Sequence, residues 1–168
     1  MMQGEAVRIR AARASDLDTL VAYNAAMALE TESKTLDPAV LRAGVARVLA
    51  EPARGFYLVA EVEGAVAGCL MITFEWSDWR NGDWWWLQSV YVVPAHRRHG
   101  VFRALYQEVE HRATERADVV GVRLYVERDN ARAQQTYEAF GMCEDQYRMY
   151  GKKLRPPVGK AVDVDVDA

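Results

Sequence analysis

A strand-like run that leads through a basic turn into a helix constrains the fold of this chain more than any other feature of its sequence. Residues 90–93, Val-Tyr-Val-Val, stop at Pro94, and residues 97–100, Arg-Arg-His-Gly, open a helical stretch. The first backbone N–H groups of a helix have no intrahelical acceptor and lie at the positive end of its dipole. Gly100 lets the backbone approach a ligand closely, and the two arginines add charge-assisted donors. The turn therefore predicts an anion site that suits a phosphate.

The helix after this turn is supported by its own periodicity. Its apolar residues fall at steps of four, at Val101, Leu105, Val109 and Ala113, and polar residues take much of the remaining surface. Neither common nucleotide loop is present, because the chain has no Gly-x-Gly-x-x-Gly and no phosphate loop ending in Gly-Lys-Ser or Gly-Lys-Thr. We therefore expect a pyrophosphate ligand other than a simple dinucleotide or nucleoside triphosphate.

A second segment carries polar residues at helical spacing. After the strand-like residues 124–126, Asn130, Ala133 and Tyr137 follow at offsets of three and four, which places them on one helix face. In isolation, such an asparagine is more often a helix N-cap and such a tyrosine a core aromatic residue. Beside the basic turn, we instead expect both side chains to face the ligand.

Together the two segments resemble the GNAT N-acetyltransferases, a superfamily that binds acetyl-CoA through an Arg/Gln-x-x-Gly-x-Gly/Ala signature between a strand and a helix. Arg97 and Gly100 match this signature, whereas Phe102 stands where the family has a small residue. The second segment matches through residues 124–142, and the resemblance extends over residues 7–150. We expect the ring of Phe102 to turn into the core and to leave the helix N–H groups available.

The resemblance implies a fold and a set of cofactor contacts. The implied fold is α+β, a single GNAT-like domain at residues 1–154 with a mixed, mostly antiparallel central sheet flanked by about four helices, followed by a C-terminal tail at residues 155–168. Acetyl-CoA is the implied co-substrate, Tyr137 is the implied general acid, and the strand before the turn would pair its backbone with the pantetheine arm. The residues implied at the cofactor are Val90, Tyr91, Val92, Val93, Arg97, Arg98, His99, Gly100, Val101, Phe102, Arg103, Asn130 and Tyr137.

Local patterns predict the order of the elements. Strand-like alternation begins at residues 7–10, and Asp37-Pro38 is a typical start for the second of two helices. Glu63-Gly64 and Asn81-Gly82 are turn signals that join three antiparallel strands. Residues 142–150 are expected to form a last strand that completes the sheet. The predicted order of strand, two helices, three strands, helix, strand, helix and strand is also that of the GNAT fold.

The sequence specifies the general base and the acceptor pocket less closely than the cofactor site. Glu75, at the end of a strand, and Asp78, in the turn that follows, are our candidates for the base because the next strand brings the thioester nearby. A polar hairpin without a catalytic role fits the same segment equally, and water or an already neutral amine would make a base unnecessary. The acceptor is expected to be a cationic amine. The residues expected to contact it are Asn24, Glu30, Glu32 and Asp78, and the residues expected to form an aromatic wall around it are Trp76, Trp79, Trp84 and Trp86.

Composition argues against several other classes of protein. The chain has 21 Lys and Arg against 24 Asp and Glu, a net charge of -3, and no aromatic RNA-binding motif, so no nucleic-acid partner is expected. Cys69 and Cys143 are isolated and the histidines are scattered, so no metal is expected. Without an apolar run of about 18 residues or a signal peptide, we expect no membrane association and a cytoplasmic location.

We therefore expect an acetyl-CoA-dependent N-acetyltransferase that moves an acetyl group to an amine of a small molecule or peptide by direct attack in a ternary complex. The alternative is a non-catalytic acyl-CoA-binding or regulatory module that has kept the phosphate site. The tryptophan-rich segment from Trp76 to Trp86 also fits the face of a homodimer.

Overall fold

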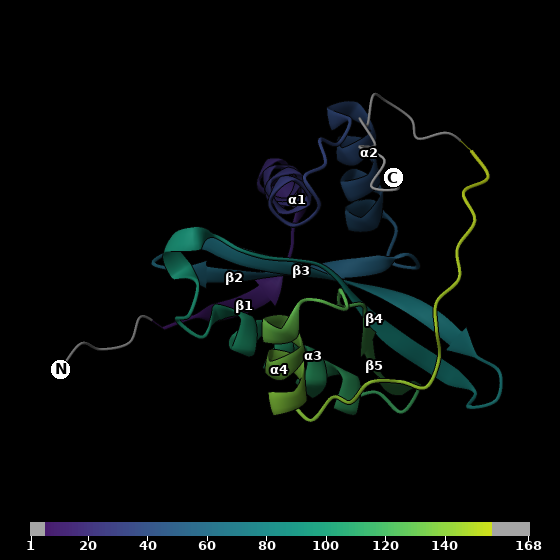
Figure 1. Ribbon diagram of the computed structural model, residues 1–168. Coiled ribbons are helices and arrows are strands. Elements are labelled where there is room, and N and C mark those ends of the chain that lie inside the picture. The colour runs from purple at the N-terminus through teal and green to yellow at the C-terminus, as the bar shows by residue number, and fades with distance from the viewer. Residues whose placement is uncertain (1–5, 156–168) are drawn as a thin grey trace.

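A five-stranded sheet organises the molecule, whose computed structural model describes residues 6–155 (Figure 1). The strands are β1 (Arg8–Ala11), β2 (Gly55–Val62), β3 (Ala65–Ser77), β4 (Gly82–Val92) and β5 (Val119–Leu124), and they lie side by side in chain order. β1 to β4 are antiparallel neighbours, whereas β5 runs parallel to β4. The predicted mixed, mostly antiparallel sheet is confirmed.

Two pairs of helices cover the two faces of this sheet. α1 (Leu17–Glu32) and α2 (Pro38–Ala50) lie on one face, and α3 (Val101–Thr114) and α4 (Ala131–Ala139) lie on the other (Figure 1). The parallel pairing of β4 with β5 requires a crossover connection, which α3 supplies. The element order confirms the predicted α+β fold as far as α4. Among the described residues, no helix has both the length and the apolar character needed to cross a membrane.

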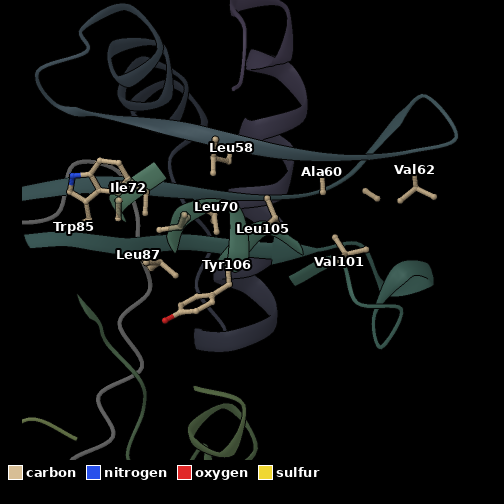
Figure 2. Close-up of a cluster of buried hydrophobic side chains, with 13 residues drawn as sticks. Leu58, Ala60, Val62, Leu70, Ile72, Trp85, Leu87, Val101, Leu105 and Tyr106 are labelled. Atoms are coloured by element: carbon tan, nitrogen blue, oxygen red, sulfur yellow. The ribbon is translucent and has the colours of Figure 1, made fainter. Parts of the chain in front are cut away.

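Both faces of β2 are buried because its side chains alternate between the two helix layers. Leu58, Ala60 and Val62 pack on the α3 side in one core cluster, whereas Tyr57 and Val59 pack on the α1 and α2 side in another. Figure 2 shows the first cluster, in which α3 residues Val101, Leu105 and Tyr106 lie against the strands. The predicted apolar stripe of α3 is therefore the face that packs on the sheet.

The predicted turn and cap signals form as expected. The Asp37 carboxylate accepts hydrogen bonds from the backbone N–H groups of Ala39 and Val40, each at 2.9 Å, and so caps α2. Glu63-Gly64 connects β2 to β3, and residues 78–81 connect β3 to β4. Both pairs of strands joined in this way are antiparallel, as the turn signals predict.

An ion-pair cluster joins β1 to the start of α1. Arg10 donates hydrogen bonds to both carboxylate oxygens of Asp16, at 2.8 and 3.0 Å, and to Glu61 of β2 at 2.7 Å. Asp16 ends a short 3-10 helix, Ala14–Asp16, directly before α1, and it is only 6% exposed. The backbone N–H of Arg13 also donates to Asp16. The cluster thereby fixes the position at which α1 begins over the sheet.

The prediction of a last strand is wrong. Residues 142–150 are described by the structure and form no strand, so the described sheet ends at β5. After α4 the chain turns at Gly141, whose φ of 81° is left-handed, and continues with exposed side chains at Tyr147, Met149 and Tyr150. Strand propensity reflects packing against neighbouring strands, so alternation alone does not place a segment in the sheet. The expected tail at 155–168 lies outside the described residues except for Arg155.

Candidate cofactor and acceptor site

The basic turn ends at a helix start that offers donors to an anion. A short 3-10 helix, Pro94–His96, follows β4, and α3 begins directly after Gly100. Gly100 has a φ of 80°, a conformation that glycine adopts without strain, and a Cβ there would meet nothing within 4 Å. Within the described chain no side chain caps α3, so the N–H groups of its first turn can bind an anion.

β4 separates from β5 beside this turn. The β4–β5 ladder ends at the pair Leu87–Leu124, whereas β4 continues to Val92. In this continuation the register against β3 shifts around Ser89, whose φ is 51°, and such a β-bulge increases the local twist. Residues 88–92 therefore have backbone groups on one edge that β5 does not pair. An extended ligand can add to an edge of this kind.

A hollow with a volume of about 370 Å³ lies at this separation. Its lining comes from β4, the basic turn, α3 and α4, and consists of Val90, Arg97, Phe102, Asn130, Arg132, Ala133, Thr136 and Tyr137. Residues expected at the cofactor from four separate parts of the chain thus meet at one place. Other expected residues do not line it: Tyr91 and Val101 are buried in the two cores, and Arg98, His99 and Arg103 are exposed.

Tyr137 reaches the hollow from α4. Asn130 caps this helix by accepting a hydrogen bond from the backbone N–H of Ala133 at 3.1 Å, so its side chain has a structural role as well as a place in the lining. Burial raises the pKa of the Tyr137 phenol above its ordinary value of 10.0. The phenol therefore keeps its proton at neutral pH and can act as a donor.

The ring of Phe102 supports the ring of Tyr137. The two ring centroids lie 6.0 Å apart in a T-shaped arrangement, and Phe102 makes a second T-shaped contact with Phe140 at 5.8 Å. Phe102 packs against the core cluster beneath α3, as expected from the sequence, and it also lines the hollow. The aromatic side chain at this position of the signature thus forms part of the wall of the site.

Sequence reasoning missed Arg132 and Thr136, which line the hollow from α4. The Thr136 hydroxyl donates a hydrogen bond to the Arg132 carbonyl at 3.0 Å, one turn earlier. A signal was available, because residues 132 and 136 are four apart and so share a face of the predicted helix. Arg132 adds a second cationic side chain to the lining, beside Arg97.

Glu75 lies on the sheet face that carries α1 and α2. Trp85 and Leu87 of β4 point to the α3 core, so the alternating neighbours Trp84 and Trp86 point to the other face, together with Glu75. The Glu75 carboxylate accepts hydrogen bonds from Trp86 Nε1 at 2.7 Å and from Arg123 Nη1 at 3.0 Å. Both of its oxygens therefore have donors, and Glu75 is not part of the lining of the hollow.

The aromatic wall that the sequence predicts divides into two parts. Trp84 carries the guanidinium of Arg123 at 3.9 Å from its ring centre, and Trp86 stacks on Tyr125 with ring centroids 4.4 Å apart. Trp76 is 59% exposed and Trp79 87% exposed at the far end of the β3–β4 hairpin. The structure therefore places Trp84 and Trp86 beside Glu75 and leaves the other two tryptophans open to solvent.

Asn24 lies inside the core between α1 and the sheet. It is 6% exposed, and its amide donates hydrogen bonds to the Leu20 carbonyl at 2.9 Å and to the Tyr57 hydroxyl at 3.3 Å. Its polar atoms are thus directed to protein partners, and its contribution is to hold α1 on β2.

The three remaining acceptor candidates lie at different places. Asp78 is exposed in the β3–β4 turn, where it accepts the backbone N–H of the next residue at 2.9 Å. Glu32 forms an ion pair with Lys34 at the end of α1. Glu30 forms an ion pair with Arg97 at 2.6 Å, and it is the acceptor candidate that contacts the basic turn.

A free strand edge beside a donor-rich helix start suits a ligand with an extended arm and a diphosphate, and this combination is expected of a CoA-dependent acyltransferase. The family model described as "Acetyltransferase (GNAT) family" matches residues 21–142. The chain belongs to this family of N-acetyltransferases, as the resemblance of its two segments predicts.

Comparison with solved structures agrees with this assignment. A possible acetyltransferase from Clostridium difficile 630 is 43% identical, with a TM-score of 0.85, over 90% of this chain and all of that chain. Aminoglycoside N-acetyltransferase AAC(6')-Iy, in a complex with CoA, has a TM-score of 0.72 at 16% identity over 92% of this chain and 99% of its own. Ribosomal-protein-alanine N-acetyltransferase from Brucella melitensis biovar Abortus 2308 has a TM-score of 0.69 at 18% identity over 88% of this chain and 99% of its own. The last two likenesses show the fold alone. No curated protein sequence matches the chain.

The donor set of the hollow fits CoA. Positive charge from Arg97 and Arg132 and the first N–H groups of α3 suit a diphosphate, and the open edge of β4 suits the amide-containing pantetheine arm. Among the described residues, no group of three or more His, Cys, Asp or Glu side chains is placed to hold a metal ion.

Proposed function

We propose that this protein is an acetyl-CoA-dependent N-acetyltransferase that transfers an acetyl group to an amine of a small molecule or peptide by direct attack in a ternary complex. The observation that carries the proposal is the hollow, because its lining joins the free edge of β4, the anion-binding turn and the phenol of Tyr137. A site that only binds the cofactor would need the free strand edge and the basic turn. A protonated tyrosine beside them can also supply the proton that acetyl transfer requires.

Backbone and side-chain groups would share the binding of the cofactor. The N–H groups at the start of α3, with Arg97 and Arg132, would hold the diphosphate, and residues 88–92 would pair with the pantetheine arm. Asn130 borders the same hollow from the start of α4. The main-chain contacts explain why valines suffice at Val90, Val92 and Val93, which also pack against the core.

The residues of the hollow can perform the proton transfer of the reaction. When bound, acetyl-CoA would supply an acetyl group activated as a thioester, from which the CoA sulfur must leave. The amine nitrogen would form a bond to the acetyl carbon and give up a proton, the carbon–sulfur bond would break, and the sulfur would take a proton. Tyr137 is the donor of that proton in our proposal, because its raised pKa keeps the phenol protonated at neutral pH. A backbone N–H on the open edge of β4 can polarise the carbonyl oxygen.

Several carboxylates lie on the sheet face that carries α1 and α2 or at the end of α1, and the acceptor that suits them is a cationic amine. Glu75 lies on this face beside Trp84 and Trp86, and Glu30 and Glu32 lie at the end of α1. An aminoglycoside acetyltransferase and a ribosomal-protein-alanine acetyltransferase share this fold, so amines of small molecules and of peptides both remain within the proposal. Neither likeness chooses between them.

The proposed function is tested by thiol release from acetyl-CoA against a panel of amines, with correction for spontaneous hydrolysis. The panel should contain polyamines, aminoglycosides and peptides with free N-termini. We expect release that depends on the amine and is matched by acetylated product in the mass spectrum. Tight binding of acetyl-CoA without release for any amine would favour the non-catalytic binding module, and no binding of CoA would contradict the proposal altogether.

Glu75 is proposed as the base that receives the proton of the amine. We expect Glu75→Gln to lower kcat/KM of the active amine about tenfold at pH 7, because a half-exposed carboxylate can be replaced in part by water. The deficit should shrink as the pH rises and more of the amine is already neutral. Asp145→Asn is the matched control, since it removes another carboxylate partner of Arg123, at 3.6 Å, without touching Trp86. If Glu75→Gln and Asp145→Asn lowered kcat/KM equally, Glu75 would only position Arg123 and would not act as the base.

A further inference from the structure

Glu30 connects the end of α1 to the basic turn. Its Oε2 lies 2.6 Å from Nη2 of Arg97, and its Oε1 accepts a hydrogen bond from the Tyr91 hydroxyl at 3.2 Å. The guanidinium of Arg97 lies 5.5 Å from the centre of the Tyr91 ring. The hydrogen bond from Arg97 lowers the pKa of Glu30, so the carboxylate is ionised at neutral pH. Through Glu30, an ion pair therefore joins α1 to the turn that follows β4, and a hydrogen bond joins α1 to β4 itself.

Arg97 belongs to the hollow as well as to this ion pair. Its Nε donates a hydrogen bond to the Val92 carbonyl at 2.8 Å, and its Nη2 is engaged by Glu30. The side chains of Arg97 and Glu30 are 43% and 41% exposed, so a ligand can reach the pair. A phosphate group is a strong acceptor for a guanidinium and prefers to engage two of its N–H groups. A diphosphate bound at the start of α3 would therefore draw on donors that Glu30 now uses.

We propose that the carboxylate of Glu30 and the diphosphate of the cofactor compete for Arg97. This inference rests on the proposed function, which supplies the diphosphate. Binding would exchange one charge pair for another, because the pair between Arg97 and Glu30 breaks as the pair between Arg97 and the diphosphate forms. Glu30 thus stabilises the cofactor-free protein and weakens cofactor binding.

The exchange also changes the charge at the end of α1. Once Arg97 turns to the diphosphate, Glu30 is an exposed carboxylate without its cationic partner, and it can bind the positive charge of an amine acceptor. Because binding equilibria are linked, CoA then strengthens the binding of a cationic acceptor by the same factor by which the acceptor strengthens that of CoA. An acceptor without positive charge gains nothing from the exchange.

The test is calorimetric titration of CoA into the full-length wild-type protein and its variants at low salt. We expect Glu30→Gln to bind CoA about threefold to fivefold more tightly than wild type, the range expected for an exposed ion pair. Glu30→Asp keeps the charge but shortens the side chain by one methylene, and it should tighten binding about twofold. The matched control is Glu32→Gln. It removes the same charge only two residues after Glu30, but the Glu32 side chain pairs with Lys34. Its affinity should stay within about 1.5-fold of wild type, and thermal melting should show that every variant is folded.

A double substitution separates competition from a general effect of charge. In an Arg97→Gln background, Glu30→Gln should leave the Kd for CoA unchanged, because the contested donor is gone. Weaker binding by Glu30→Gln, or equal tightening by Glu30→Gln and Glu32→Gln, would overturn the competition. If the wild type bound no CoA, the proposed function itself would fail. If the wild type bound CoA and both Glu30 variants matched it, only the competition would be wrong.

Discussion

Replacing Tyr137 by phenylalanine should lower kcat for amine-dependent thiol release about 100-fold and leave the Kd for CoA within about twofold of wild type. The substitution removes a phenol oxygen and keeps the ring, so the T-shaped contact with Phe102 at 6.0 Å can persist. In our proposal, the substitution removes the proton for the departing sulfur. The measurement is steady-state release at saturating acetyl-CoA, together with calorimetric titration of CoA.

The pH dependence of the same reaction gives a second readout. Burial raises the pKa of Tyr137, so loss of its proton should reduce the rate only at pH values above the ordinary phenol value of 10.0. Tyr147→Phe is a suitable control, because that side chain is 71% exposed and does not line the hollow. Release that is unaffected by Tyr137→Phe would remove Tyr137 from catalysis while leaving the cofactor site in place.

Replacing Asp16 by asparagine should reduce the free energy of unfolding by about 3 kcal/mol at pH 7, a typical effect of removing one partner from a buried charge cluster. Arg10, whose side chain is only 14% exposed, would keep Glu61 but lose the negative charge of Asp16 and one of the two oxygens that accept its hydrogen bonds. Asp16 itself is 6% exposed, so solvent cannot replace the missing charge. Urea unfolding at pH 7 measures the effect. Asp18→Asn, which changes a carboxylate whose side chain is 83% exposed, should cause little change.

The effect of Asp16→Asn should also depend on pH in a definite direction. The hydrogen bonds from Arg10 lower the pKa of Asp16 below its ordinary value of 3.8, against the opposing effect of burial. Asp16 therefore binds fewer protons in the folded protein than in the unfolded chain. Its stabilisation is present above pH 3.8 and is lost as the pH falls through the lower, folded pKa. The gap between wild type and variant should thus narrow on acidification, and a constant gap down to pH 2 would contradict this account.

Local sequence signals predicted most elements because they act within a few residues. The cap at Asp37 and the stripe from Val101 to Ala113 each depend on groups two to four positions apart, and both form as predicted. The strand expected at residues 142–150 depends instead on a partner far away in the chain. Alternating side chains do not select that partner, so the segment lies outside the sheet that the structure describes.

The candidate site likewise has residues that local motifs predicted and residues whose place depends on contacts between distant parts of the chain. Arg97, Asn130 and Tyr137 could be chosen from the sequence because each belongs to a short motif, and the structure brings all three to the hollow. Arg132 was missed because its place in the lining depends on how α4 lies beside α3. Asn24 was expected at the acceptor, but its position on α1 directs its amide to Tyr57 within the core.

The sequence by itself determined most of the elements and the basic turn between β4 and α3, because caps, turns and helical stripes are decided by neighbours along the chain. Only the tertiary structure decided that β4 leaves β5 at Leu87, that Glu75 accepts donors from Trp86 and Arg123, and that Glu30 meets Arg97. Glu30 and Arg97 are 67 residues apart in the chain. Contacts of this kind form where separate elements pack, and nothing in the neighbourhood of either residue specifies them.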